Sequence, residues 1–135
     1  MSTMIFPGRY DSLAKIAEFV TDEARASGLN RTQVFAVETA VDEACSNIIE
    51  HAYGAEDVGD IHCTTCSDAN SFTIILEDHG KPFDPTSVPN PDLNSPLRER
   101  PSHGLGYYMM HQWMDEVTFD FHDDRNRLIL VKLKA

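Results

Sequence analysis

The chain has 135 residues, of which 41% are hydrophobic and 24% charged, and this predicts one globular domain over residues 1–135. Its formal charge of −11 argues against direct nucleic-acid binding, which needs clustered Lys and Arg, and against binding to an anionic membrane surface. No stretch approaches the roughly 18 apolar residues of a membrane-spanning helix and neither end resembles a signal peptide, so we expect a cytoplasmic protein.

The first third of the chain predicts a short strand and two helices. Met4–Phe6 is typical of an opening strand. A helix is then indicated by apolar residues at helical spacing, and Gly28 is a natural C-cap for it: Leu13, Ile16, Ala17, Val20 and Ala24. Asn30 and Gln33 form a capping box for a second helix, which we expect to run to about Tyr53.

The second helix carries polar side chains beside its apolar face. Glu43, Asn47 and His51 recur every four residues, so at about 100° per residue they stand in one row. This row borders an apolar arc formed by Val37, Ala40, Val41, Ala44, Ile48 and Ala52, and Cys45 on this arc is predicted to be a core thiol. If the row points into a cleft, the carboxylate can take a proton and the carboxamide can hold a hard cation. Alone, the spacing favours a solvated flank of the helix.

Residues 59–67 and 71–78 are predicted to form a β-hairpin with a turn at 68–70. Cys63 and Cys66, beside His62, resemble half of a zinc site. However, residues three apart on a strand face opposite sides, and no second pair supplies the remaining ligands. We therefore do not predict a zinc site here.

A motif follows the second strand of this hairpin, where Asp78 is succeeded by Gly80 and the motif continues through Phe83 to Pro85. A carboxylate at the end of a strand can accept a hydrogen bond from the exocyclic amine of a planar ring, and glycine lets such a ring approach the backbone. An ordinary turn at the end of a strand is the alternative.

Six of the seven prolines lie between Gly80 and His103, and a long stretch without secondary structure in a small domain indicates a functional lid, here 84–103. A surface loop without a role is the alternative. Ser102–Gly106 then opens a helix over 104–114, with Leu105, Met109 and Trp113 on one face. Backbone N–H groups at such a start can bind phosphate, and Gly104 and Gly106 allow a close approach.

Residues 116–122 and 127–134 complete the chain as two strands joined by a turn at 123–126. In order, the elements are a strand, two helices, a hairpin, the lid, a helix and a hairpin. This order predicts an α+β fold, a two-layer sandwich in which helices cover one face of a mixed, mostly antiparallel sheet.

The three motifs together resemble those of the GHKL ATP-binding superfamily. Glu43, Asn47 and His51 are similar to its N box, Asp78–Phe83 to its G1 box, and Gly104–Gly106 to its G2 box. Within the superfamily, the runs Asp42–Asn47 and His51–Tyr53 most resemble the bacterial anti-sigma-factor serine kinases. The resemblance covers about residues 5–133 and implies the Bergerat ATP-binding fold.

The resemblance also implies a role for each motif residue. Asn47 would ligate Mg²⁺ and Glu43 would be the general base, while Asp78 would bind the adenine amine of ATP. The other implied nucleotide-binding residues are Gly80, Phe83, Gly104, Leu105 and Gly106, and the position of Arg98 and Arg100 in the lid makes them candidates for phosphate contacts.

The implied function is that of an ATP-dependent serine/threonine kinase. Its substrate would be a serine of an anti-sigma-factor antagonist, and the same protein would sequester a sigma factor or a similar target. The resemblance suggests a homodimer. Two alternatives remain at this point: a non-catalytic nucleotide-binding module that regulates by association, and, less favoured, the catalytic module of a histidine kinase.

Overall fold

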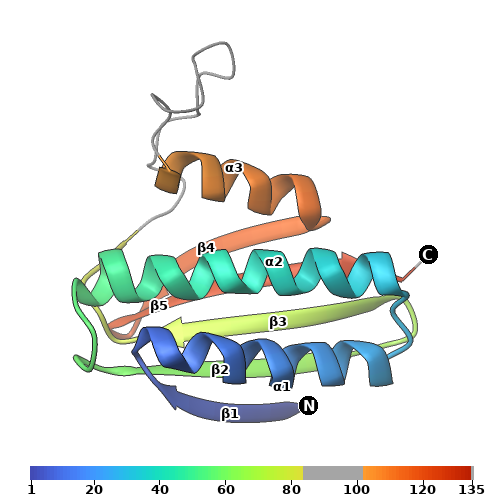
Figure 1. Ribbon diagram of the computed structural model, residues 1–135, viewed down its shortest axis with the longest axis horizontal. Coiled ribbons are helices and arrows are strands. Elements are labelled where there is room, and N and C mark those ends of the chain that lie inside the picture. The colour runs from blue at the N-terminus through green and yellow to red at the C-terminus, as the bar shows by residue number, and fades with distance from the viewer. Residues whose placement is uncertain (84–101, 135) are drawn as a thin grey trace.

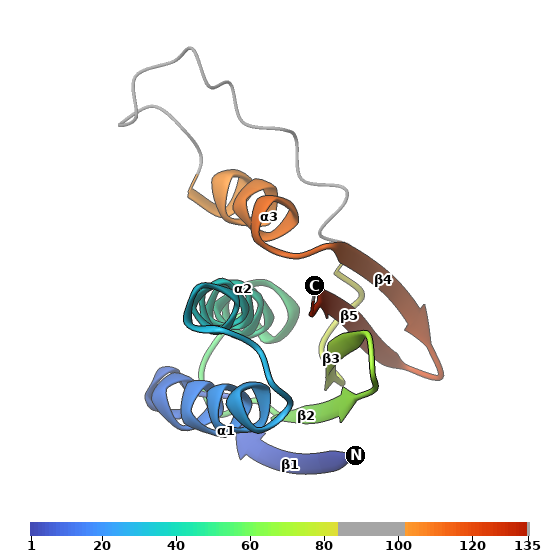
Figure 2. The same ribbon diagram turned by 90° about the vertical axis from the view of Figure 1, so that its right-hand side faces the viewer.

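The computed structural model describes residues 1–83 and 102–134, and for residues 102–107 it describes the backbone alone. Most of the expected lid, together with Arg98 and Arg100, lies outside the described residues. The molecule has two layers, helices on one side and a β-sheet on the other (Figures 1 and 2). This arrangement confirms the predicted α+β sandwich.

The sheet has five strands in the order β1-β2-β3-β5-β4. Their bounds are β1 Ser2–Pro7, β2 Asp60–Ser67, β3 Ser71–Asp78, β4 Glu116–His122 and β5 Arg125–Leu133. Every neighbouring pair is antiparallel, so the sheet of the described residues contains no parallel pairing of the kind that the word "mixed" allowed.

The helices all cover the same face of the sheet (Figure 2). A short 3₁₀ turn, η1 (Tyr10–Ser12), leads into α1 (Leu13–Ala26). The second helix, α2 (Arg31–Asn47), continues into a π-helical segment, η2 (Ile48–Tyr53). The third helix, α3 (Ser102–Trp113), packs against α2.

Local sequence signals set the helix ends as expected. Asn30 and Gln33 form the predicted capping box, in which each side chain accepts a hydrogen bond of 2.8 Å from the other residue's backbone N–H. Gly28 follows α1 with a φ of 101°, and Gly54 ends η2 with a φ of 80°. Both lie in the left-handed region that glycine adopts most readily.

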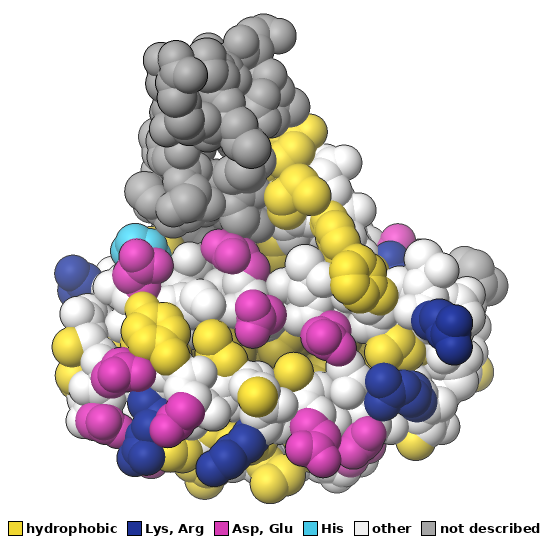
Figure 3. Space-filling model, viewed as in Figure 1, with side chains coloured by type: hydrophobic (Ala, Val, Ile, Leu, Met, Phe, Trp, Pro, Cys, Tyr) yellow, Lys and Arg dark blue, Asp and Glu magenta, His cyan; other side chains and the backbone are white. Residues whose placement is uncertain are grey.

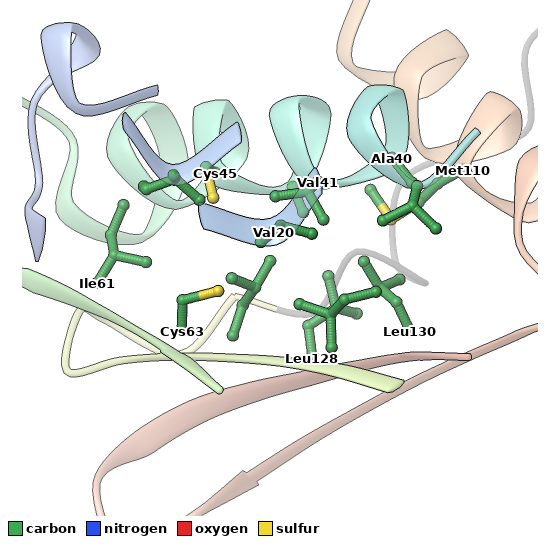
Figure 4. Packing of buried hydrophobic residues seen from close by; sticks show 14 of the residues in the cluster. Val20, Ala40, Val41, Cys45, Ile61, Cys63, Met110, Leu128 and Leu130 are labelled. Carbon is green, nitrogen blue, oxygen red and sulfur yellow. The ribbon is translucent and has the colours of Figure 1, made fainter. Parts of the chain in front are cut away.

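The core lies between the two layers (Figure 4). Val20, Val41 and Cys45 enter it from the helices, and Cys63 and Leu128 enter it from the sheet. Cys45 is thus the core thiol that the sequence predicted. Cys66 is exposed on the other face of β2, and among the described residues no three His, Cys, Asp or Glu side chains are grouped to hold a metal ion.

The helix predicted over 104–114 is present as α3, and residues next to the predicted apolar stripe are the ones that reach the core. Met109 is 37% exposed, whereas Met110 and Met114 are almost fully buried and reach the core. Trp113 instead lies against Phe35 of α2, with ring centroids 5.2 Å apart. The four-residue spacing correctly identified a helix, but it could not say which of two adjacent apolar stripes reaches the core.

The last hairpin also differs from the prediction. Its turn contains only Asp123 and Asp124, both at positive φ (53° and 60°), as in a type I′ turn. This turn matches the twist of the flanking strands, so pairing continues to the turn and β5 begins at Arg125. Asn126, which the sequence placed in the turn, is therefore a strand residue that pairs with Asp78.

Charged side chains are unevenly distributed over the surface that covers the helices. Asp and Glu side chains are spread over the middle of this face, whereas Lys and Arg lie towards its margins (Figure 3). Within residues 1–83 and 102–134, no helix has the length and apolar character that crossing a bilayer would require.

Candidate functional site

The candidate site lies where η2, the end of β3 and the β4–β5 turn meet, at the left-hand end of the molecule in Figure 1. At its centre is Asp78, the last residue of β3, which is only 2% exposed. Its Oδ1 atom accepts a hydrogen bond of 2.8 Å from the Gly80 N–H and one of 2.9 Å from Asn126 Nδ2. These bonds compensate for burying a carboxylate, which would otherwise be costly.

The pocket beside Asp78 lies between the helical layer and the sheet, and about 330 Å³ of it, including space open to solvent, is not filled by protein atoms. Its described lining is largely apolar, and the polar side chains in it are those of Asn47, Asp78 and Asn126. A mostly apolar pocket with a few convergent polar groups is the usual form of a small-molecule site. The apolar lining residues are Ala44, Ile48, Leu76, Phe83, Met110, Phe119 and Leu128.

Asn47 is the pocket residue contributed by the row on α2. It is 6% exposed, and its carboxamide makes no hydrogen bond to any of the described residues. A buried carboxamide with no partner in the described part of the chain has an oxygen available for a ligand. Glu43 lies one helical turn earlier and is half-buried. It is not among the described residues that line this pocket.

His51, the third member of the row, stacks on Phe83. The two ring centroids are 5.1 Å apart and the rings are inclined by 22°. Because η2 is π-helical, its turn is wider than that of α2. The structure thus brings His51 and Phe83 together at the edge of the pocket, and it brings Asn47 and Asp78 into the pocket itself.

The structure gives Gly80 a packing reason that the sequence did not suggest. A Cβ atom at this position would lie 2.6 Å from the backbone carbon and oxygen of Ala52. The Lys81 N–H donates a hydrogen bond of 2.9 Å to the same oxygen. The glycine therefore lets the chain after β3 lie directly against η2.

Tyr53, the last residue of η2, ties the same loop to β2. Its hydroxyl donates to the Asp60 carbonyl oxygen and accepts a hydrogen bond of 3.1 Å from the His79 N–H. Its ring fills a notch between Gly8 and Gly59, where an added Cβ would come within 3.3 Å and 2.6 Å of the ring, respectively. His79, the residue after Asp78, is thus linked to β2 through the Tyr53 hydroxyl.

Burial is the main influence on the charge of Asp78. It raises the pKa of this carboxyl above the ordinary value of 3.8, while the Asn126 side chain, the Gly80 N–H and the neighbouring His79 act in the opposite direction. The charged form of Asp78 is therefore stabilised by its hydrogen-bond donors against the effect of burial.

Asn126 is the site residue that sequence reasoning missed. It is 4% exposed, and its Nδ2 atom donates to Asp78 Oδ1 and to the Lys81 carbonyl oxygen, each at 2.9 Å. Its Oδ1 atom accepts a hydrogen bond of 3.1 Å from the Phe83 N–H. No local pattern indicates these contacts, because the pairing of β3 with β5 brings together residues 48 positions apart.

Gly104, Leu105 and Gly106 lie in the first turns of α3, as the sequence predicted for a motif that opens a helix. Only their backbone is described, so their place relative to the pocket stays a prediction. The phosphate-binding role of Arg98 and Arg100 falls outside the described residues.

A family model for the histidine kinase-like ATPase domain matches residues 6–132. Relatives from Bacillus cereus (strain G9842) and Bacillus thuringiensis (strain Al Hakam), each named serine-protein kinase RsbW, are 29% identical to the chain over 133 residues. These matches cover 96% of this chain and 82% of each relative.

Among solved structures, the crystal structure of the RsbU and RsbW domains of Rv1364c from Mycobacterium tuberculosis is similar, with a TM-score of 0.64 over 98% of this chain. The sequence identity is 13%, so this likeness concerns the fold alone. The chain spans about a third of the length of that protein chain, 33%.

Proposed function

Because the chain belongs to the histidine kinase-like ATPase domain family, we propose that it is an ATP-dependent serine/threonine protein kinase acting as an anti-sigma regulatory factor. The name of the relatives, serine-protein kinase, supports this function over a purely non-catalytic module. The observation that carries the proposal is the buried Asp78 carboxylate at the end of β3, beside an apolar pocket shared with Asn47.

In this proposal the adenine of ATP lies in the pocket beside Asp78. The two described donors to this carboxylate both reach Oδ1. Oδ2 is then the acceptor for the exocyclic amine of adenine, and the apolar lining contacts the ring. Phe83, stacked on His51, closes one edge.

Asn47 and Glu43 act on the phosphate side. The carboxamide oxygen of Asn47, which has no partner among the described residues, fits a hard cation, and such a cation usually takes only one or two protein oxygens beside those of phosphate. Mg²⁺ bound there would neutralise charge on the transferred phosphoryl group. Glu43 accepts the proton of the attacking serine hydroxyl as general base, and the backbone at Gly104 and Gly106 approaches the phosphates.

The protein substrate in this proposal is an anti-sigma-factor antagonist, which is phosphorylated on a serine, and the second partner is a sigma factor or a similar regulatory target. The acidic helical face of Figure 3 suits a partner with a basic surface. A homodimer and a cytoplasmic location stay predictions.

Glu43→Gln tests the kinase proposal. The substitution keeps the size and hydrogen bonding of the side chain but removes its basicity, so phosphoryl transfer to the antagonist should fall by about 10²–10⁴-fold. Affinity for ATP, measured by calorimetry, should change little. Glu38→Gln is the matched control, because Glu38 is an exposed glutamate of the same helix.

Equal transfer rates in Glu43→Gln and Glu38→Gln would remove the general-base assignment. A wild-type protein that binds ATP and the antagonist but transfers no phosphate would instead identify a non-catalytic regulatory module. Asn47→Ala tests the cation site separately: the dependence of ATP affinity on Mg²⁺ should flatten, and an undiminished dependence would place the ligand elsewhere.

A further inference from the structure

We propose that Asn126 is a positioning residue that fixes which oxygen of Asp78 meets the nucleobase, and that it thereby sets the preference for an amino over a keto group at purine C6. The inference rests on the proposed binding of adenine at Asp78. It starts from the register of β5, in which Asn126 lies directly opposite Asp78 and both side chains point into the buried side of the sheet. Side chains paired in this way are close enough to bond directly.

The orientation of the Asn126 carboxamide follows from its partners. Asp78 Oδ1 and the Lys81 carbonyl oxygen are both acceptors, so the NH₂ group must face them, and the Phe83 N–H is a donor, so the carbonyl oxygen must face it. Both hydrogens of Nδ2 are thus used within the protein. Asn126 has no donor left for a ligand and acts through Asp78 and the 81–83 segment.

These contacts constrain the carboxyl group of Asp78. Oδ1 accepts from both Gly80 and Asn126, which directs its lone pairs towards the protein. Oδ2 is left to face a base, as an acceptor that fits an amine. If the Asn126 donor is removed, the carboxyl can rotate, and its protonated form can donate to a keto oxygen instead.

The titratable groups around Asp78 define how its protonation would be read. Cys45 of α2 and Tyr53 of η2 interact with it electrostatically, and burial raises the pKa of each, so both are uncharged at neutral pH. His79 is next to it in the chain and favours the charged carboxylate, as do the Asn126 amide and the Gly80 N–H. Loss of the amide therefore moves the Asp78 pKa upward.

The test compares Asn126→Ala and Asn126→Asp with wild type by calorimetric titration with ATP and GTP between pH 5 and pH 8. The control is Asn70→Ala, since Asn70 is an exposed asparagine in the β2–β3 turn. For Asn126→Ala we expect roughly tenfold weaker ATP binding, the equivalent of one charge-assisted hydrogen bond. The ratio of ATP to GTP affinity should fall. The acid limb of the ATP profile, meaning the pH range in which ATP affinity falls as Asp78 is protonated, should move to higher pH.

For Asn126→Asp we expect ATP affinity to change with pH in a direction that a merely structural role of Asn126 would not produce. At neutral pH it places a second carboxylate against Asp78, so ATP binding should be weaker than in Asn126→Ala. As the pH falls, the pair takes up one proton, and a protonated carboxyl at 126 can donate to Asp78 Oδ1 as the amide did. ATP affinity of this variant should therefore rise with acidification, whereas that of Asn126→Ala falls.

An unchanged ATP-to-GTP ratio and acid limb in Asn126→Ala would overturn the proposal. If Asn126→Ala fails to fold, the pH series on Asn126→Asp decides alone, and a profile that is flat or falls with acid overturns it. Failure of the proposed function is distinguishable, because the wild-type protein would then show no ATP preference and Asp78→Ala would leave ATP binding unchanged.

Discussion

At the scale of single residues, Asp78 combines a cost to the fold with its proposed role in binding. Its burial disfavours the charged form, and its hydrogen-bond donors restore that form only in part, so its pKa lies above the ordinary value. A carboxylate whose pKa is raised in the folded chain is typical of a residue retained for function and not for stability.

We therefore expect Asp78→Asn to separate stability from nucleotide choice. An asparagine oxygen can keep the bonds from Gly80 and Asn126, but its amide would face the base as a donor. ATP binding should weaken by about 30- to 150-fold, corresponding to the loss of 2–3 kcal/mol. GTP, which presents a keto oxygen, should lose much less affinity in the same titration.

The effect of the same substitution on stability follows from linkage. Because the pKa of Asp78 is higher in the folded chain than 3.8, the folded state holds more protons than the unfolded state between these two values. The free energy of unfolding therefore falls as the pH rises through this window and stays lower above it. Asp78→Asn cannot titrate, so at pH 7 its urea midpoint without nucleotide should equal or exceed that of wild type.

Asp68→Asn is the control, because the pKa of Asp68 is shifted in the direction opposite to that of Asp78. Asp68 is an exposed turn residue, and N–H groups of Asn70 and Ser71 lower its pKa. Its substitution should leave ATP binding unchanged and bring no gain at pH 7. A clear loss of stability in Asp78→Asn, or an unchanged ATP-to-GTP ratio, would contradict the account of Asp78.

Asp78 could be found from the sequence because a strand, an acidic residue and a glycine stand next to each other in the chain. Asn126 could not be found in this way, because its role depends on pairing with β3 and on a two-residue turn. The two turn residues have positive φ angles, but neither is a glycine that would have indicated such a turn. Asp-Asp is a weaker signal for such a turn than Asn-Gly. The missed residue is thus a consequence of the missed turn.

At the scale of elements, the junction between η2 and the segment after β3 is the critical contact. The capping box at Asn30 was predictable because its two residues are three apart. The widening of α2 into the π-helical η2 was not, because it accommodates contacts made by distant residues at Gly80, Phe83 and Asp60.

Gly80→Ala should weaken this junction. The new Cβ would lie 2.6 Å from the Ala52 backbone, which the Lys81 N–H also contacts, so one of the two segments must move. Overpacking of this kind costs about 1–3 kcal/mol. The loss should appear both in the free energy of unfolding and in ATP affinity, since Asp78 is bonded to the Gly80 N–H.

Gly28→Ala provides the comparison for that experiment. Its φ of 101° makes alanine unfavourable there, but no atom lies within 4 Å of the added Cβ. This variant should lose about 1 kcal/mol of stability through backbone conformation alone and bind ATP normally. If Gly80→Ala behaved in the same way as Gly28→Ala, the close packing on Ala52 would have no part in binding.

At the scale of the whole molecule, stability depends on the packing of two layers around one core. The three cysteines can report on this packing, because they differ in burial. Cys45 in the helical layer and Cys63 in the sheet are both buried between the layers (Figure 4). Cys66 is exposed. Burial raises the pKa of Cys45 well above its ordinary value and that of Cys63 to about 12. The layer arrangement was predictable from the order of the elements, and the core position of Cys45 from its place on the apolar arc of α2.

Thiol labelling should therefore show one fast cysteine and two slow ones. In the folded protein at pH 8, Cys66 should react with a disulfide reagent, whereas Cys45 and Cys63 should react only when the layers separate. In denaturant all three should react together. Cys66→Ser should abolish the fast phase, and rapid labelling of Cys63 in the native state would contradict the described packing.

The pairing of β3 with β5 has an evolutionary consequence. Alternate residues of β5 face opposite sides of the sheet, and the core residues Leu128 and Leu130 hold its register. If Arg127 were deleted and Leu128 kept its place, Asn126 would shift by one position and turn towards solvent. Arg125 would then lie opposite Asp78. We therefore expect lineages descended from this protein to vary the pocket by substitution at position 126, and to leave the number of residues between it and Leu128 unaltered.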